Sequence, residues 1–223
     1  MEACKKISVH IADDQEHCLA ALELALEDAP DIHITGIARD GKQLLALTTD
    51  NPPDVVITDI NMSGTDGIAA TRLIRERYPL IKILGFTQYT DERLFIEMMH
   101  AGADGYLFKG MDSRTIAEAV RAVMGDRVFY CNKTLKKMAQ VLRQGIFRLS
   151  AQPLPPGFFT GKEKEVLLLL CHGLSGKQIA AELDLTLNTV NKYRANLRKK
   201  TGRVNDAMLV LFAVEQRLFI PEP

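Results

Sequence analysis

Short apolar runs alternate with segments of helical spacing through the first 124 residues of the chain. Short, mainly apolar runs, interrupted only by single polar residues such as Ser8, His10 and Lys82, are typical of strands buried on both faces of a parallel sheet. They are residues 7–11, 55–58, 81–86 and 105–108. Between them, apolar residues recur every three or four positions, as at Leu19, Leu22 and Leu26, which predicts amphipathic helices. The alternation predicts five βα units arranged as an α/β doubly wound five-stranded parallel sheet with helices on both faces.

The pattern changes after residue 124, where the strand-like runs stop. Lysines and apolar residues at 133–142 predict one basic, moderately amphipathic helix, and Gln-Pro-Leu-Pro-Pro-Gly at 152–157 predicts a stiff tether. The remainder is helical by pattern, with short turns that predict a small all-α helix-turn-helix domain. The expected helices cover residues 163–171, 176–183, 187–200 and 207–218. The expected parts of the chain are a domain at 1–124, a linker at 125–157 and a second domain at 158–223.

Charge is distributed unevenly along the chain, although the formal net charge is zero. Residues 1–124 hold 12 basic and 20 acidic side chains, a net charge of −8. Residues 125–156 carry a net charge of +5 and residues 157–223 a net charge of +3. An acidic first part and a basic remainder indicate different partners, with a polyanion favoured for the basic part. Uneven charge alone is also typical of an ordinary solvated surface.

The four cysteines, Cys4, Cys18, Cys131 and Cys171, form neither a metal-ligand spacing nor a redox pair. Separate thiols of this kind are typical of a reducing compartment inside the cell. No apolar run approaches about 18 residues, and the charged start of the chain leads directly into a predicted strand. We therefore expect a soluble cytoplasmic protein without a membrane span or a signal peptide.

Polar side chains follow four of the predicted strands, at the point where each strand ends. They are Asp13 and Asp14 after the first strand, and then Asp59, Thr87 and Lys109 after the three later ones. Because the carboxyl ends of parallel strands meet at one edge of a sheet, we expect these groups to converge there. Each of them alone is also explained by turn or helix-cap chemistry, so only their joint occurrence in this order predicts a functional site. Three carboxylates, one hydroxyl and one ammonium group suit a hard cation and a phosphoryl group.

A carboxylate that accepts a phosphoryl group gives each of these residues a role. Such a carboxylate needs a cation to neutralise the incoming oxygens, and Mg²⁺ prefers carboxylate and carbonyl oxygens. Asp14 and Asp59 are the expected direct ligands, Asp13 acts through water, and the backbone carbonyl of Asn61 supplies a further oxygen. Asp59 then attacks with its second oxygen. The lysine offers a positive charge and the threonine a hydroxyl donor.

In the order and spacing of these groups, residues 5–124 resemble the receiver domain of two-component response regulators, which has a flavodoxin-like fold. The resemblance rests on the acidic pair, Asp59 within Thr-Asp-Ile-Asn-Met-Ser-Gly, Thr87, and Lys109 after Gly-Tyr-Leu-Phe. It implies that a sensor histidine kinase transfers a phosphoryl group from its phosphohistidine to Asp59. It also implies a switch in which Thr87 moves toward the phosphoryl group and the ring of Tyr106 turns inward.

Two residues depart from the receiver pattern. The family usually has proline where this chain has Ser63, and it often has proline after the lysine, where this chain has Gly110. Both changes loosen loops beside the site without removing a reacting group. We therefore expect altered phosphorylation kinetics, with the phosphoacceptor function retained.

The second domain resembles the LuxR-type helix-turn-helix over residues 158–218, so the whole chain resembles regulators of the NarL/FixJ type. The motifs that carry this resemblance lie at residues 159–167, 173–180 and 185–194. Ser175 is expected to cap the scaffold helix and Thr186 the recognition helix, because their hydroxyl groups can accept hydrogen bonds from free backbone N–H groups.

A recognition helix places short polar groups at base edges and cations at phosphates. The resemblance assigns Asn191, Lys192 and Ala195 to the base-reading face, where asparagine pairs bidentately with adenine and lysine reaches guanine. The residues expected at phosphates are Lys177, Arg194, Arg198, Lys199 and Lys200, with Thr189 and Tyr193 as hydroxyl donors.

The last predicted helix carries Ala207, Leu211, Val214 and Leu218 at helical spacing. This face either packs against the core of its own domain or, as the resemblance suggests, takes part in a homodimer that binds two half-sites. A dimer through the receiver is the other open arrangement.

The sequence therefore indicates a phosphorylation-switched transcription regulator that is not an enzyme, apart from hydrolysis of its own phosphoryl group. The expected partners are double-stranded DNA, a sensor histidine kinase and a second copy of the chain, with RNA polymerase as a further candidate. A phosphohydrolase of the haloacid-dehalogenase type uses similar groups but needs an aspartate two residues after the nucleophile, where this chain has Asn61. The other alternative is a phosphorylation-independent DNA-binding or docking protein whose receiver serves for dimerisation.

Overall fold

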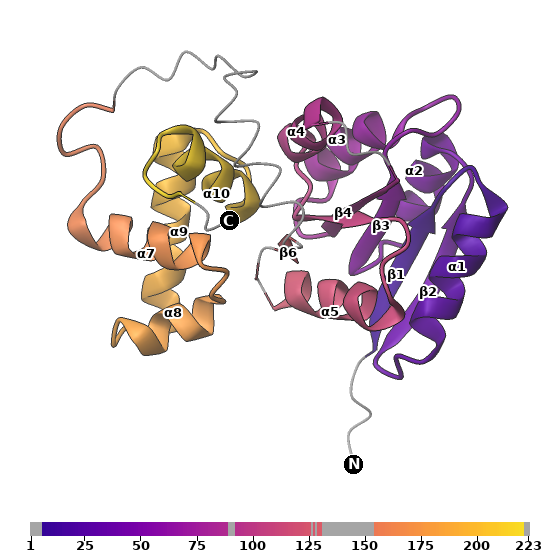
Figure 1. The fold of residues 1–223 in the computed structure, drawn as a ribbon, viewed down its shortest axis with the longest axis horizontal. Helices are drawn as coiled ribbons and strands as arrows, with labels where there is room; N and C mark the ends of the chain where they lie inside the picture. The colour runs from indigo at the N-terminus through magenta and orange to yellow at the C-terminus, as the bar shows by residue number, and fades with distance from the viewer. Residues whose placement is uncertain (1–5, 89–91, 126, 128, 131–153, 221–223) are drawn as a thin grey trace. The chain divides into compact units, whose positions relative to one another are not determined.

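The computed structural model describes residues 6–88, 92–125, 127, 129–130 and 154–220. The chain forms two compact units, Met1–Met124 and Gly125–Pro223, whose elements are labelled in Figure 1. The predicted basic helix at 133–142 and the first two residues of the predicted tether at 152–157 lie outside the described residues. The predicted role of this segment as a linker therefore stays a prediction.

The sheet has the strand order β2-β1-β3-β4-β5-β6, and its strands β1 to β5 form the centre of the first unit (Figure 1). Its strands are β1 (Ile7–Ala12), β2 (Ile32–Ala38), β3 (Val55–Asp59), β4 (Lys82–Thr87), β5 (Gly105–Phe108) and β6 (Phe129–Tyr130). Parallel pairing joins β1 to β2 and to β3, β3 to β4, and β4 to β5. The predicted five-stranded parallel sheet is confirmed. The short β6 is an addition, and two residues are too few to show a periodic pattern in the sequence.

Helices cover both faces of this sheet. They are α1 (Glu16–Glu27), α2 (Gly41–Asp50), α3 (Gly67–Arg77), α4 (Glu92–Ala101) and α5 (Ser113–Met124). Helix α1 contacts α5, whereas α3 contacts both α2 and α4, so these two sets lie on opposite faces (Figure 1). The central strand β3 is buried along its whole length, as expected for a parallel sheet covered on both sides.

The second unit is built from α7 (Gly161–Cys171), α8 (Gly176–Glu182), α9 (Leu187–Thr201) and α10 (Asp206–Glu215). Each helix begins after a residue whose side chain accepts a hydrogen bond from a free backbone N–H. These residues are Thr160, Ser175, Thr186 and Asn205. The two caps predicted from the sequence, at Ser175 and Thr186, are confirmed. The short turn between α8 and α9 gives the predicted helix-turn-helix arrangement.

All four helices contribute to one apolar core in the second unit. It includes Val166, Leu167, Leu170, Ile179, Val190, Leu197, Leu209, Val210 and Ala213. Helix α10 therefore packs against the core of its own unit, and a dimer contact through this helix stays a prediction. The contributing residues of α10 are Leu209, Val210 and Ala213. Of the predicted face, Leu218 follows the end of the helix and packs against this core, whereas Ala207, Leu211 and Val214 are buried but are not part of it. Among the described residues, no helix is both long enough and apolar enough to cross a membrane.

Candidate functional site

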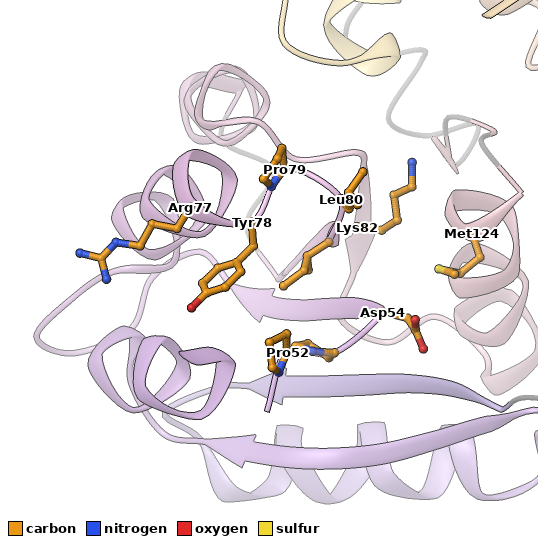
Figure 2. A pocket seen from close by; sticks show the side chains of 10 residues that line it. Pro52, Asp54, Arg77, Tyr78, Pro79, Leu80, Lys82 and Met124 are labelled. Atoms are coloured by element: carbon orange, nitrogen blue, oxygen red, sulfur yellow. The ribbon is translucent and has the colours of Figure 1, made fainter. Parts of the chain in front are cut away.

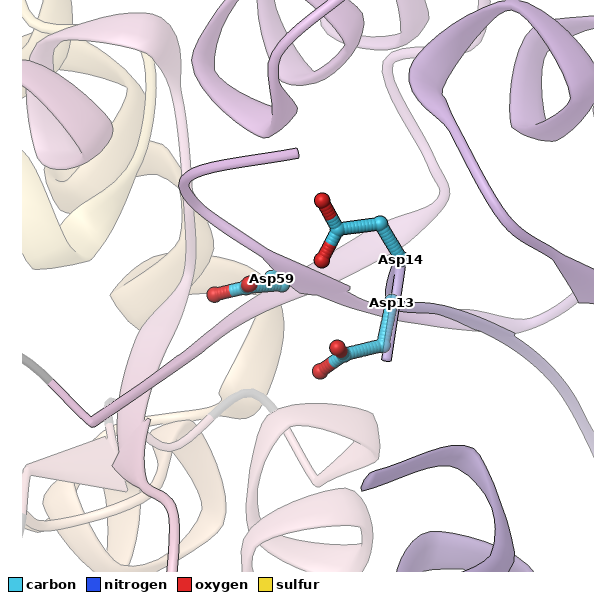
Figure 3. A group of neighbouring side chains, drawn as sticks. All are labelled: Asp13, Asp14 and Asp59. Carbon is cyan, nitrogen blue, oxygen red and sulfur yellow. The ribbon is translucent and has the colours of Figure 1, made fainter. Parts of the chain in front are cut away.

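Three carboxylates meet at the carboxyl end of the sheet (Figure 3). Asp13 and Asp14 directly follow β1, and Asp59 is the last residue of the neighbouring strand β3. One carboxylate oxygen of each residue lies within 4.8 Å of the other two. Asp13 and Asp59 are buried, whereas Asp14 is exposed. The expected convergence of these three residues is confirmed, and solvent reaches the cluster at Asp14.

Lys109 follows β5 and lies against two of the carboxylates. Its Nζ is 2.7 Å from Asp13 Oδ2 and 3.1 Å from Asp59 Oδ2, with 9% of the lysine side chain exposed. Burial alone would lower the pKa of Lys109, but its hydrogen bonds to the two carboxylates outweigh that effect and raise the pKa. Burial also raises the pKa of Asp59, and the hydrogen bond from Lys109 offsets only part of this effect. The cluster thus holds three carboxylates but one ammonium group, which contacts two of them, and this leaves an excess of negative charge.

The backbone around Asp59 is fixed where β3 ends. The N–H of Ile60 donates to Asp59 Oδ1 at 2.7 Å, and Lys109 donates to Oδ2, so both carboxylate oxygens have a donor. A Cβ atom on Gly67, the first residue of α3, would lie 1.8 Å from the carbonyl oxygen of Asp59. The close approach of α3 to the end of β3 therefore requires glycine. No role for Gly67 was expected from the sequence, because a glycine after a polar residue is a common turn signal.

The two predicted switch residues lie on β4, which pairs with the strand of Asp59, and on β5, which pairs with β4. Thr87 is buried at the end of β4, and its carbonyl oxygen accepts a hydrogen bond from the N–H of Lys109 at 2.7 Å. Tyr106 on β5 is 1% exposed, with its ring centroid 4.9 Å from that of Phe95 and 5.5 Å from that of Phe108. The inward orientation expected of Tyr106 after phosphorylation is therefore already present. The movement of Thr87 stays a prediction.

The two departures from the receiver pattern have structural consequences. The backbone N–H of Ser63 donates to Asp14 Oδ2 at 3.1 Å, a contact that proline cannot make because it has no N–H. Gly110 has φ +90°, whereas the ring of proline fixes φ near −65°. The loop after Lys109 therefore follows a backbone path that proline could not adopt.

The carboxylate cluster fits a magnesium ion by its donor set and its charge. Hard oxygen ligands are those that Mg²⁺ prefers, and Asp13, Asp14 and Asp59 supply them within 4.8 Å of one another. Their mutual repulsion is only partly balanced by Lys109, so a divalent cation would relieve it. Asn61 lies in the exposed loop after β3, and the contribution of its carbonyl oxygen to the metal stays a prediction.

A pocket of about 410 Å³ lies at the other end of the sheet (Figure 2). It is lined by Asp54, which precedes β3, and by Lys82, which begins β4, so it adjoins the amino ends of these strands. Its walls also include the apolar side chains of Pro52, Leu80 and Met124 (Figure 2). None of the described residues predicted to take part in phosphoryl transfer lines it. The candidate chemistry of the first unit is therefore at the carboxylate cluster.

The recognition helix α9 exposes part of the predicted DNA-binding set. The exposed members of this set, on α8 and α9, are Lys177, Asn191, Lys192, Ala195, Lys199 and Lys200. Thr189 and Tyr193 are partly buried, and Tyr193 packs against the core of the second unit. The Thr189 hydroxyl lies 2.8 Å from the hydroxyl of the cap residue Thr186. The DNA contacts of these eight predicted residues stay predictions.

Arg194 is not available as the predicted phosphate contact. It is 6% exposed and forms a buried ion pair with Asp206, the first residue of α10. The phosphate assignment was wrong because the arginine was placed by its charge and not by its position on the helix. Arg194 lies on the buried face of α9 with Val190 and Leu197, a spacing of four and three residues that the sequence already contains.

Two further basic residues of α9 also have carboxylate partners. Arg198 Nη1 lies 2.9 Å from Asp206 Oδ1, and 35% of the arginine side chain is exposed. Lys200 Nζ lies 2.6 Å from Glu163 Oε2 and 3.2 Å from the carbonyl oxygen of Phe158. These contacts join α9 to α10 and to the start of α7. The phosphate contacts predicted for Arg198 and Lys200 stay predictions.

Comparison with known proteins matches both units. The family of response regulator receiver domains matches residues 9–121, and the luxR family of bacterial regulatory proteins matches residues 158–213. The transcriptional regulatory protein LiaR of Bacillus subtilis is 33% identical over 212 residues, which cover 95% of this chain and 99% of LiaR.

Solved structures of response regulators are also similar to this chain. The crystal structure of ChrA, from a heme-sensing two-component system, is 30% identical with a TM-score of 0.53, and the match covers 96% of this chain and 99% of ChrA. The complex of the response regulator RcsB with DNA has a TM-score of 0.58 at 21% identity, covering 95% of this chain and 99% of RcsB. The likeness to RcsB shows the fold alone. With both domains matched along their length, the chain belongs to the two-component response regulators that join a receiver domain to a LuxR-type DNA-binding domain.

Proposed function

We propose that Asp59 accepts a phosphoryl group from the phosphohistidine of a sensor histidine kinase, and that this controls binding to double-stranded DNA. The observation that carries the proposal is the contact of Lys109 with both Asp13 and Asp59 inside an acidic cluster. It supports phosphoryl transfer because the lysine orients the acceptor carboxylate and supplies a positive charge at the place where phosphoryl oxygens would arrive.

In the proposed transfer, a carboxylate oxygen of Asp59 attacks the phosphorus atom. The bond between phosphorus and the imidazole nitrogen of the kinase breaks, and the imidazole leaves with the bonding electron pair. Bound Mg²⁺ would neutralise charge on the phosphoryl oxygens, and the residues that would hold it are Asp13, Asp14, Asp59 and the carbonyl of Asn61. Lys109 then pairs with a phosphoryl oxygen. The chain acts here as a phosphoryl acceptor that hydrolyses at most its own acyl phosphate.

Recognition of DNA is assigned to α9. Asn191, Lys192 and Ala195 face the bases, and Lys177 and Lys199 contact phosphates, because exposed polar groups at these helix positions suit the major groove. The relative LiaR is a transcriptional regulatory protein, which supports control of transcription. The active form is a homodimer that works in the cytoplasm, with RNA polymerase as a further partner.

Transfer to Asp59 is tested with the purified full chain, Mg²⁺ and a small acyl-phosphate donor. The measurement is the hydroxylamine-sensitive phosphoryl mass on the intact protein. Asp59→Ala is expected to abolish it, because Asp59 supplies the attacking carboxylate oxygen in the proposed transfer. Asp31→Ala, which removes a carboxylate just before β2 at the amino end of the sheet, is the control and should keep the label. Label that persists at another residue of Asp59→Ala would refute the assignment.

Phosphorylation-independent DNA binding is the second candidate, because Tyr106 already lies inward without a phosphoryl group. Selection from a pool of random duplexes, with and without Mg²⁺ and the donor, separates the two. A sequence enriched only with the donor, and lost in Asp59→Ala, supports control by phosphorylation. Equal enrichment in all samples supports the second candidate.

A further inference from the structure

Arg194 connects the buried interior of the second unit to an exposed side chain of the recognition helix. Its Nε and Nη2 atoms pair with Asp206 Oδ2, and its remaining terminal nitrogen, Nη1, donates to Asn191 Oδ1 at 3.2 Å. The arginine is 6% exposed, whereas Asn191 is exposed. A buried guanidinium thus holds the amide oxygen of a residue assigned to the bases.

The ion pair beneath this contact is itself well fixed. Asp206 is buried at the first position of α10, where the free N–H groups of the helix favour a negative charge. Its other oxygen, Oδ1, pairs with Arg198 at 2.9 Å. Because both oxygens of Asp206 have cationic partners, the guanidinium of Arg194 has one orientation, and its Nη1 atom points at Asn191.

Helix α8 packs closely against the contact between Arg194 and Asn191. A Cβ atom on Gly176, the first residue of α8, would lie 3.0 Å from Arg194 Nη1 and 3.7 Å from Asn191 Oδ1. The φ of Gly176 is not in the left-handed region, so glycine is needed here for space and not for backbone conformation. The backbone of α8 therefore packs directly against the Arg194–Asn191 contact.

The direction of the Asn191 amide follows from donor chemistry. Arginine has only donors, so the atom that faces Arg194 must be the amide oxygen, and the NH₂ group points away from it. We propose that Arg194, seated by Asp206 and Gly176, fixes Asn191 so that it offers N–H donors to the major groove. This inference rests on the proposed reading of bases by Asn191.

A fixed orientation of the Asn191 amide changes the base with which this residue is expected to pair. Bidentate pairing with adenine needs the amide oxygen to accept from N6 while the amide nitrogen donates to N7. With its oxygen directed at Arg194, Asn191 instead suits bases that present acceptors in the major groove without an amino donor beside them, which are guanine (O6 and N7) and thymine (O4). In adenine the N7 acceptor lies next to the N6 amino donor, which would be left without an acceptor. Arg194 is thus a positioning residue for specificity, although it touches no base.

The test begins with the duplex sequence that the full chain selects from a random pool. Affinity is then measured for duplexes that carry each of the four bases at each position of that site. At the one position where Asn191→Ala removes the preference, wild type is expected to favour guanine or thymine over adenine by about tenfold. Asn191→Asp, an exposed change that replaces the outward donor by an acceptor, should move the preference to cytosine.

Two variants test the positioning role itself. Arg194→Lys keeps a charge for Asp206 but is expected to reduce the preference at that one position to about threefold, with affinity for a scrambled duplex unchanged. Gly176→Ala should act in the same direction. Gly161→Ala is the matched control, because Gly161 also begins a helix after a capping residue but a Cβ there meets nothing within 4 Å.

The contrary results are distinct. A preference for adenine at the Asn191-dependent position would overturn the inference, as would an unchanged preference in both Arg194→Lys and Gly176→Ala. A site at which Asn191→Ala alters no single position would overturn it too. A pool with no enriched sequence, with or without the phosphodonor, would instead refute sequence-specific DNA binding by this chain, and the inference with it.

Discussion

Each unit of the molecule buries carboxylates beside cationic side chains, but the two clusters balance their charges in opposite ways. In the receiver, Asp13, Asp14 and Asp59 face the single ammonium group of Lys109. In the DNA-binding unit, the single carboxylate of Asp206 lies between two arginines. The first cluster is left with excess negative charge, and the second has every oxygen of its carboxylate paired.

The difference separates a reactive site from a structural one. A buried group whose charge is fully paired stabilises one arrangement and resists change, because removing either partner leaves an uncompensated charge. A cluster of like charges gains free energy by binding a cation or by losing one of its members. The same types of side chain therefore hold the second unit together and prepare the first unit for ligands.

The largest expected effect is at Asp206, the carboxylate that lies between Arg194 and Arg198. Asp206→Ala would leave Arg194 buried without a carboxylate, and we expect the second unit to lose about 3–5 kcal/mol of unfolding free energy. Chemical denaturation, with hydrogen exchange of α9 and α10 to locate the loss, measures it. Glu182→Ala at the exposed end of α8 is the control and should change stability by less than about 0.5 kcal/mol. A loss below about 1 kcal/mol in Asp206→Ala would show that the Asp206 cluster does not stabilise the second unit, and the proposed difference between a structural and a reactive cluster would be wrong.

The pair of Glu163 with Lys200 should show a smaller cost and a defined pH dependence. Burial alone would raise the pKa of Glu163, but hydrogen bonds from Lys200 and from Thr160 outweigh it and lower the pKa below its ordinary value of 4.5. The ionised form is thus favoured by folding, so its contribution is present above pH 4.5 and is lost as the pH falls through the lowered pKa.

Glu163→Gln removes this charge and keeps an acceptor for the Thr160 backbone. We expect it to reduce stability by about 1 kcal/mol at neutral pH and to equal wild type in acid, where Glu163 is protonated. Denaturation curves of wild type and Glu163→Gln, recorded from neutral pH to below pH 4.5, compare their free energies of unfolding. A constant difference at every pH would show that the charge of Glu163 is not what stabilises the contact.

In the carboxylate cluster of the receiver, the loss of one carboxylate should raise the free energy of unfolding, whereas the loss of Asp206 lowers it. In Asp13→Asn, Lys109 keeps Asp59 as a partner while one of three like charges is gone, so the receiver should gain up to about 1 kcal/mol when a chelator is present. The same change should weaken magnesium binding about tenfold, since one of the negative charges that would hold the ion, here through water, is lost. Denaturation in chelator and calorimetric titration with Mg²⁺ measure the two effects. Destabilisation as large as that of Asp206→Ala would mean that both clusters are structural.

The smallest effect is expected in the loop after β3. Ser63→Pro removes the N–H that donates to the exposed carboxylate of Asp14, and we expect magnesium affinity to fall about threefold because the ligand is no longer held in place. Ser63→Ala keeps the N–H and is the matched control. Equal affinities in the two variants would show that this hydrogen bond does not orient Asp14 for the metal.

The receiver site was largely predictable from the sequence, because parallel strands bring their carboxyl ends to one edge of a sheet. The positions of Asp13, Asp14, Asp59, Thr87 and Lys109 followed from the strand pattern alone. The second strand was expected but was not located. Its buried and exposed residues do not form a continuous apolar run, since β2 lies at the edge of the sheet.

The parts that were not predictable depend on contacts between distant residues. The partner of Arg194 lies twelve residues away on another helix, and the helical pattern does not reveal this contact. The charge of Arg194 predicted a phosphate contact, whereas its position on the helix predicted a buried side chain. The inward orientation of Tyr106 depends on its packing with Phe95 and Phe108. Such orientations depend on which side chains the fold brings together, and a periodic pattern does not contain that information.

The contact of Gly67 with the end of β3 constrains how this protein can evolve. At positions 63 and 110 the chain already differs from the usual receiver pattern, and the carboxylate cluster persists. A single methyl group at position 67 would instead collide with the main chain of the phosphoacceptor, 1.8 Å from its carbonyl oxygen. Relatives that keep Asp59 as the phosphoacceptor can therefore vary in the loops after β3 and β5 but not at Gly67, the first residue of α3, where any side chain would meet the main chain of Asp59.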